Sequence, residues 1–179
     1  MKKIDWNAVE EAKDFARICE GGYVCKIIKV EDVPEKEYLL VYCDVAEGDF
    51  KDYGYNSEVA TSNDWNYIKL YRSYKQTAQG FFKSFLNTLE KSNPRRFVVN
   101  AFDGNEHKLV GLMLGIVLGS EEYQGKDGDV KVRTYAKTLT TPDAIRKGDF
   151  KVPELKKLPC SVTDTPATIP NAVNDDCPF

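Results

Sequence analysis

The sequence predicts a mainly β fold in which one helix separates a group of three strands from a final pair. Five stretches are rich in β-branched and aromatic residues, or alternate between apolar and polar side chains as half-buried strands do. One stretch between the third and fourth of them has its apolar residues at helical spacing instead. After residue 158 the composition changes to Pro, Thr, Ala, Ser and Asn, which is typical of a solvated linker.

An N-terminal helix is expected before the strands, over residues 5–19. Asp5 can cap its first turn, apolar residues recur at helical spacing, and Gly21 and Gly22 follow as a stop signal.

The first two strands are expected over residues 23–33 and 37–48, on either side of a short polar loop that contains Pro34. The period of two in the second strand divides its side chains between two faces. One face carries Leu39, Val41, Cys43 and Val45, and the other carries Tyr38, Leu40, Tyr42 and Asp44. A third, less regular strand is expected within residues 49–72, which are dense in aromatic and turn-forming residues.

The strongest helical pattern covers residues 73–94, with Ser73 available as a cap and Asn93-Pro94 as a stop. Its apolar residues are Ala78, Phe81, Phe82, Phe85, Leu86 and Leu89. Two further strands, over residues 108–123 and 129–140, are joined by a hairpin turn. The apolar run from Leu109 to Leu118 is far shorter than the roughly 20 residues of a membrane-spanning helix, so it predicts a strand bent at its glycines.

Three strands, a helix and two strands is the element order of the oligonucleotide-binding (OB) fold, a small five-stranded barrel. The expected fold is therefore a mainly β, five-stranded OB barrel with a helix between strands 3 and 4, preceded by an N-terminal helix. The expected domains are residues 1–158, an OB-fold single-stranded DNA-binding domain, and residues 159–179, a disordered linker that ends in an acidic, protein-docking tip.

Charge and cysteine usage limit the classes of function. All 25 basic residues precede residue 159, while three of the 28 acidic residues (Asp164, Asp175 and Asp176) follow it, so the body is formally neutral. A nucleic-acid-binding role therefore requires basic residues gathered on one face. Five cysteines without a Cys-x-x-Cys pair favour reduced thiols, and no apolar leader follows Met1, so a cytoplasmic location without membrane association is expected.

Two clusters mix cations with aromatic rings, which is the combination that binds single-stranded nucleic acid: cations follow the phosphates, and rings stack on unpaired bases. The first precedes the long helix and comprises Trp65, Tyr67, Lys69, Tyr71, Arg72, Tyr74 and Lys75. The second is one face of the fifth strand, where alternation places Lys131, Arg133, Tyr135 and Lys137. The alternative is that several of these rings belong to the core and that the lysines only solvate a strand.

A nuclease is a further alternative. Asp44, Asp49 and Lys51 resemble the carboxylates and lysine that hold a divalent metal and activate water. The tight spacing and a second Asp-Phe-Lys at residues 149–151 weaken this interpretation. No catalytic residue, metal or cofactor is therefore expected, and the protein is expected not to be an enzyme.

The C-terminal residues Asp175, Asp176, Cys177, Pro178 and Phe179 resemble the acidic tip of bacterial single-stranded DNA-binding proteins, which ends in Asp-Asp, a branched apolar residue, Pro and Phe. Cys177 departs from that pattern. The body is similar to phage and prophage replication-module proteins in "YCDVAEGDFKDY", "GFFKSF" and "EEYQGKDG". The resemblance implies a tip that docks replication and repair proteins.

The function expected from the sequence is binding of single-stranded DNA without strong sequence preference during replication, recombination or repair. The tip is expected to recruit partner proteins, and a homo-oligomer is expected because one barrel offers few stacking sites. An adaptor module with weak DNA binding is the principal alternative.

Overall fold

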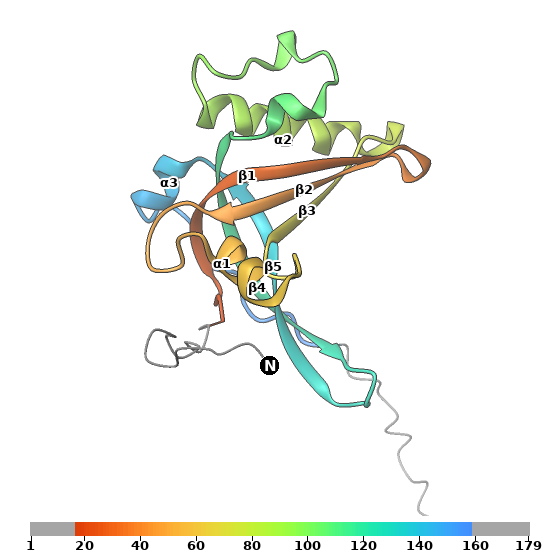
Figure 1. Ribbon diagram of the computed structural model, residues 1–179, viewed down its shortest axis with the longest axis vertical. Helices are drawn as coiled ribbons and strands as arrows, with labels where there is room; N and C mark the ends of the chain where they lie inside the picture. Colours follow the sequence, from red (N-terminus) through yellow and green to blue (C-terminus); the bar gives the residue numbers. More distant parts are fainter. Residues whose placement is uncertain (1–16, 159–179) are drawn as a thin grey trace, which may run out of the picture.

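Five strands form one antiparallel sheet in the computed structural model, which describes residues 17–158 (Figure 1). The strands are β1 (Gly21–Val33), β2 (Tyr38–Val45), β3 (Ile68–Ser73), β4 (Met113–Gln124) and β5 (Val130–Thr140). Their order across the sheet is β3-β2-β1-β4-β5, so β3 and β5 form its two edges. The predicted mainly β class and the five strands are confirmed.

The sheet is not closed into a barrel. β1 pairs with β2 on one side and with β4 on the other, but no hydrogen-bonded ladder joins β3 to β5 within residues 17–158. The predicted OB barrel is therefore not confirmed. The fold is an open, five-stranded antiparallel sheet with a few helices.

The alternation predicted for β2 is confirmed. Val41, Cys43 and Val45 are almost completely buried in the core, together with Leu39. The opposite face is only partly open to solvent, because Tyr42 and Asp44 are also buried.

Helix α2 (Gln79–Ser92) lies between β3 and β4 in the sequence, as predicted, and crosses one end of the sheet (Figure 1). It buries Phe85, Leu86 and Leu89 and contacts β3, β4 and β5. The helix begins later than predicted, because Ser73 is the last residue of β3 and pairs with Tyr38. It ends at the predicted stop, where the Asn93 side chain bonds the backbone of β4.

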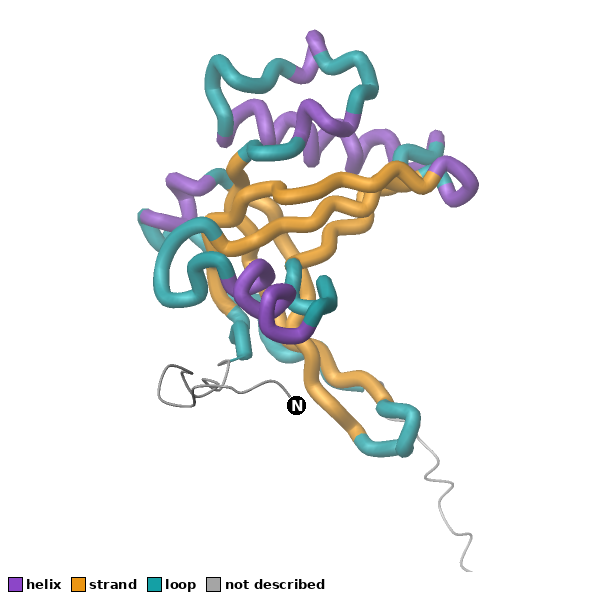
Figure 2. Tube along the Cα trace, viewed as in Figure 1, coloured by secondary structure: helices purple, strands orange, loops and turns teal. Residues whose placement is uncertain are grey.

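Helix α1 (Tyr53–Thr61) was not predicted from the sequence. It follows β2 and precedes β3, and it lies against the end of β2 (Figure 2). The remaining short helices are the 3₁₀ helices η1 (Pro34–Lys36), η2 (Gln76–Ala78), η3 (Val99–Ala101) and η4 (Glu106–Leu109), and α3 (Pro142–Arg146).

The glycine-rich run is a strand only from Met113, where β4 begins, whereas residues 109–112 end a 3₁₀ helix and form a turn. A Cβ at Gly115 would lie 2.7 Å from both Cγ1 of Ile145 and the carbonyl oxygen of Thr141, so glycine lets α3 approach β4 closely. None of the helices in the described part of the chain is long and apolar enough to cross a membrane.

The β4–β5 hairpin extends beyond the rest of the sheet as an arm (Figure 2). β1 pairs with β4 only as far as Leu118, so the outer half of β4 is not covered by β1. The C-terminal segment takes that place: Lys156 forms a parallel bridge with Glu121, through a donated bond to Ser120 and an accepted bond from Glu122.

Two sets of predictions concern residues outside the described range. Most of the predicted N-terminal helix falls there, and residues 17–20 are not helical. The linker and the tip, residues 159–179, also lie outside it. Among the described cysteines, Cys25 and Cys43 are buried free thiols, as predicted, whereas Cys19 is exposed.

Candidate nucleic-acid interface

A groove of about 900 Å³ separates the two edge strands of the sheet and brings the two predicted clusters together. One wall is formed by β3 and the loop before it, and the other by the outer parts of β4 and β5. Of the predicted binding residues, Trp65, Tyr67, Lys69, Tyr71, Arg72, Arg133 and Tyr135 line the groove. The other four, Tyr74, Lys75, Lys131 and Lys137, do not.

Strand pairing divides the β3 residues between two faces. Lys69 pairs with Tyr42 and so lies on the outer face of the sheet. Arg72 pairs with Leu39 on the inner face, where its guanidinium lies 5.5 Å from the centre of the Phe85 ring. Burial lowers the pKa of Arg72, and its Nε has no hydrogen-bond partner among the described residues. Arg72 is therefore a half-buried cation on the floor of the groove.

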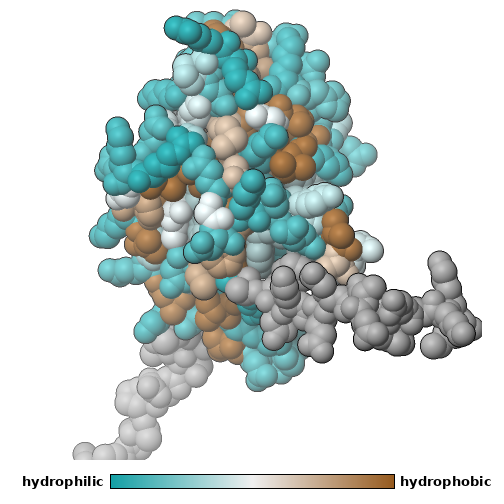
Figure 3. Space-filling view, turned by 60° about the vertical axis from the view of Figure 1, so that its left-hand side comes forward, coloured by the Kyte–Doolittle hydropathy of each residue, from teal (hydrophilic) through white to brown (hydrophobic). Residues whose placement is uncertain are grey.

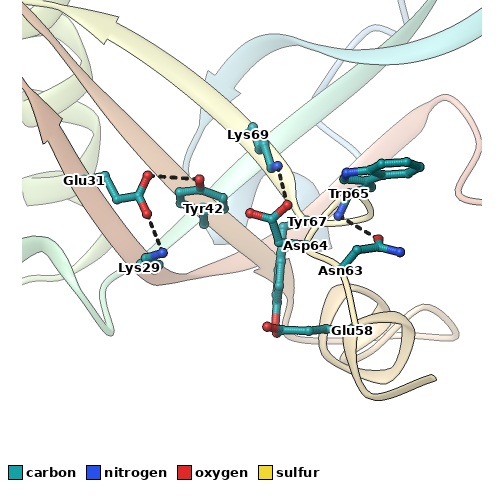
Figure 4. A network of polar contacts seen from close by, with 9 residues as sticks. All are labelled: Lys29, Glu31, Tyr42, Glu58, Asn63, Asp64, Trp65, Tyr67 and Lys69. Atoms are coloured by element: carbon teal, nitrogen blue, oxygen red, sulfur yellow. Dashed lines mark hydrogen bonds and ion pairs between the residues drawn. The ribbon is translucent and has the colours of Figure 1, made fainter. Parts of the chain in front are cut away.

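Two groove residues present exposed aromatic rings. Trp65 is 80% exposed, and its backbone amide donates to Oδ1 of Asn63 (Figure 4). Tyr71 is 63% exposed and lies against Tyr38, with the ring centres 5.6 Å apart. Rings of this kind can stack on unpaired bases. On the face drawn in Figure 3, apolar residues form separate patches between hydrophilic ones.

The other two tyrosines of the first cluster have packing roles. Tyr67 is buried, and its hydroxyl donates a 2.6 Å hydrogen bond to Glu58 on α1. Tyr74 packs edge-on against Phe82, and its hydroxyl donates to Asp32. Among the rings of the first cluster, only Trp65 and Tyr71 are therefore exposed in the described part of the chain.

Tyr42 organises the outer face beside the groove (Figure 4). The Nζ atoms of Lys29 and Lys69 each lie 5.1 Å from its ring centre, within the range of a cation–π contact. Its hydroxyl donates to Oε2 of Glu31 at 3.1 Å. Burial, together with this bond to a carboxylate, raises the pKa of Tyr42 to about 12. The phenol therefore stays protonated and holds both lysines over the sheet.

The two lysines beside Tyr42 are paired with acidic residues. Lys69 lies 2.9 Å from Oδ1 of Asp64, and Lys29 contacts Glu31 (Figure 4). The hydrogen bond from Lys69 holds the pKa of Asp64 below its usual range, and the bond from Lys29 does the same for Glu31.

The same pairing continues along the arm. Arg133 contacts Oε1 of Glu121 at 2.8 Å, and its guanidinium lies 5.2 Å from the centre of the Tyr123 ring. Lys131 pairs with Asp127 in the hairpin turn at 2.6 Å. The bonds from these cations lower the pKa of both carboxylates. Lys69, Lys131 and Arg133 are thus paired with carboxylates, whereas Arg72, which lines the groove, forms no ion pair within residues 17–158.

A register shift between Val117 and Leu118 divides the predicted basic face of β5. Lys131, Arg133 and Tyr135 pair with Tyr123, Glu121 and Gly119 respectively. Lys137 falls at the shift and has no partner in the register, so it does not continue their row. Lys137 and Lys75 are both exposed, and neither forms an ion pair with an acidic residue of the described chain.

Several residues of the interface were not predicted from the sequence. The rings are Tyr38, Tyr42 and Tyr123, and the charged residues are Lys29, Glu31, Asp64 and Glu121. The alternation of β2 already placed Tyr38 and Tyr42 on one face, which was the available signal for the rings.

The two carboxylates of the nuclease alternative, Asp44 and Asp49, lie in different surroundings. Asp44 is buried, and its carboxylate accepts hydrogen bonds from the amides of Val45, Gly54 and Tyr55 at 2.7 to 2.9 Å. Asp49 is exposed in the following loop. Within residues 17–158 no group of three potential metal ligands is present. Asp44 therefore has a structural role at the start of α1.

No protein-family model matches the chain, and no curated protein is significantly similar to it in sequence.

Proposed function

We propose that this protein binds single-stranded DNA without strong sequence preference and is not an enzyme. The observation that carries the proposal is the groove itself, where two clusters far apart in the sequence contribute Lys69 and Arg133 together with the exposed rings of Trp65 and Tyr71. Cations that follow phosphates and rings that stack on bases are the two requirements of such binding.

We further propose that the open sheet has an OB-type architecture. Its order, β3-β2-β1-β4-β5, would become that of a five-stranded barrel if β3 met β5. The helix between β3 and β4 has the position expected for that fold. The groove lies where such a barrel would close, between β3 and the arm.

The acidic tip is proposed to dock partner proteins of replication, recombination and repair in the cytoplasm. Phe179 would fill an apolar pocket of the partner, and its terminal carboxylate would pair with a cation at the rim. Assembly into a homo-oligomer would place several grooves on one strand, and light scattering with and without DNA tests it.

Titration of a fluorescent 35-nucleotide oligo-dT with the full-length protein at two salt concentrations tests the proposed function. Binding is expected, with log K falling by about 0.7 per unit of log salt for each phosphate neutralised. Magnesium should leave the oligonucleotide intact. Absence of binding at low salt would refute the proposal and favour the adaptor alternative, whereas cleavage in magnesium would favour a nuclease.

A further inference from the structure

Two cations that line the groove, Lys69 and Arg133, are paired with nearby carboxylates. Asp64 directly precedes Trp65 in the sequence and pairs with Lys69 at 2.9 Å. On the opposite wall, Glu121 lines the groove and contacts both Arg133 at 2.8 Å and Lys156 at 3.4 Å. The side chain of Glu121 is only 15% exposed, so this carboxylate lies between two cations and is largely shielded from solvent.

A phosphate that approaches Lys69 meets a cation that is already paired with Asp64, and one that approaches Arg133 meets a cation that shares Glu121 with Lys156. The contact can form, because exposed ion pairs contribute only about 0 to 1 kcal/mol and are readily exchanged. The displaced carboxylate nevertheless remains nearby, so its negative charge repels the bound phosphate. This cost grows with phosphate density, and duplex DNA carries one charge per approximately 1.7 Å of its axis.

The exposed rings favour the opposite kind of ligand. Trp65 and Tyr71 can stack only on bases whose faces are free, and each stacked base contributes about 1 to 3 kcal/mol. In a duplex these faces are covered by neighbouring base pairs. A duplex therefore meets the repulsion of the carboxylates without gaining the stacking that offsets it.

We propose that Asp64 and Glu121 are specificity-determining residues, which make the groove select unpaired bases and reject duplex DNA by pairing with Lys69 and Arg133 and by repelling closely spaced phosphates. The proposal rests on the proposed function, since it concerns how the same groove chooses between nucleic acids. The two carboxylates lie on opposite walls and act on different cations, so their effects should be separable.

The test compares the full-length protein with Asp64→Asn, Glu121→Gln and the double variant, against oligo-dT of 35 nucleotides and a 35-base-pair duplex. Asp103→Asn is the matched control, because it removes the same charge from an exposed pair with Lys108 at 2.8 Å, outside the groove. We expect the double variant to bind the duplex at least tenfold more tightly relative to oligo-dT than the wild type does. For oligo-dT, the salt slope should steepen by about 0.7 for each cation released from its carboxylate.

The outcomes separate the two proposals. If the wild type binds oligo-dT but the ratio of affinities and the salt slope change no more than in Asp103→Asn, the role of the carboxylates is refuted and the proposed function stands. If the wild type does not bind oligo-dT, both are refuted. Asp64 is on the surface, so Asp64→Asn alone, checked for folding by thermal unfolding, should still give about half of the slope change if Glu121→Gln fails to fold.

Discussion

The backbone amide of Gly54 donates a 2.7 Å hydrogen bond to Oδ1 of Asp44, which joins the start of α1 to the end of β2. Val45 donates to the same oxygen, and Tyr55 donates to Oδ2. A single buried carboxylate thus satisfies three backbone amides, two of which belong to the first turn of α1 and have no partner within the helix.

Replacing Asp44 with Asn should destabilise the protein, because an amide group has only one acceptor oxygen and would leave a buried N–H unpaired. Hydrogen bonds to charged groups contribute about 1.5 to 3 kcal/mol each, so a loss of roughly 2 kcal/mol in the free energy of unfolding is expected. Urea unfolding measures it. Asp49→Asn, at an exposed position, should change the free energy by less than about 0.5 kcal/mol. Equal effects of the two substitutions would contradict the role given to Asp44.

Tyr42 should make the stability depend on alkaline pH. The folded state raises the pKa of this phenol from 10 to about 12, so it favours the protonated form. The resulting contribution to stability is complete below pH 10 and is lost as pH rises through 12. Tyr42→Phe should cost about 1 kcal/mol at neutral pH and should weaken the decline in stability between pH 10 and 12.

Unfolding curves of the wild type and Tyr42→Phe across this range would show the difference. Part of the decline should persist in the variant, because burial and the bond to Glu58 also raise the pKa of Tyr67. Parallel curves for the two proteins up to pH 12 would show that Tyr42 ionises without affecting the fold.

The close approach of α3 to β4 predicts that Gly115→Ala is harmful. Its added methyl group would lie 2.7 Å from the backbone oxygen of Thr141, which can move only if α3 moves. Overpacking of this kind costs about 1 to 3 kcal/mol. Gly80→Ala is the control: no atom lies within 4 Å of its added methyl group, and alanine favours the helix, so stability should be unchanged or slightly higher. Thermal unfolding of both variants tests this, and an unchanged midpoint for Gly115→Ala would refute it.

The two exposed rings of the groove should contribute to DNA affinity without contributing to its salt dependence. Trp65→Ala and Tyr71→Ala should each weaken binding to oligo-dT by about 1 to 3 kcal/mol with a nearly constant salt slope, because a ring neutralises no phosphate. Phe81→Ala provides the comparison, since Phe81 is 79% exposed on α2 and does not line the groove. Equal losses from all three variants would argue against stacking in the groove.

Deletion of residues 175–179 should abolish partner docking and leave the affinity for oligo-dT unchanged or slightly higher at low salt, because the acidic tip no longer competes with phosphates. Phe179→Ala should cost about 2 kcal/mol in docking if the ring is a hot spot, whereas Cys177→Ile should preserve docking or strengthen it. Pull-downs from a bacterial lysate compare the intact protein with the deletion and with the two substitutions. Identical sets of partners from the intact and the truncated protein would show that the tip only improves solubility.

The sequence predicted the strands well because their signal is local. In β2, the alternation of Leu39, Val41 and Cys43 with outward-facing residues requires only the period of a strand. Helix α1 was missed because its sequence, YGYNSEVAT, contains Gly, Asn, Ser and Thr and lacks a clear apolar face. The first turn of α1 is stabilised by hydrogen bonds to the carboxylate of Asp44. Asp44 lies outside the nine residues of the helix, so their own sequence pattern does not predict this contact.

The candidate site was predicted only in part, because its composition is a local signal whereas its contacts are not. Composition located both clusters, but whether each ring is exposed depends on its neighbours: Trp65 is exposed, while Tyr67, two residues later, is buried against α1. The partners of the cations depend on the strand register and on turn geometry. Glu121 lies opposite Arg133 only because β4 and β5 pair as they do, so the pairing of this cation with a carboxylate could not be read from the sequence.

The parallel bridge between Lys156 and Glu121 has a consequence for solubility. Beyond Gly21, the first residue of β1, the outer half of β4 would present unpaired backbone groups, which are a template for pairing with another chain. The backbone of Lys156 occupies these groups by bonding Ser120 and Glu122, and the amide of Leu158 bonds the side chain of Glu122. Residues 150–158 thus cover an edge that could otherwise pair with another chain. A protein shortened to residue 149 should therefore self-associate through β4, whereas one shortened to residue 158 should not.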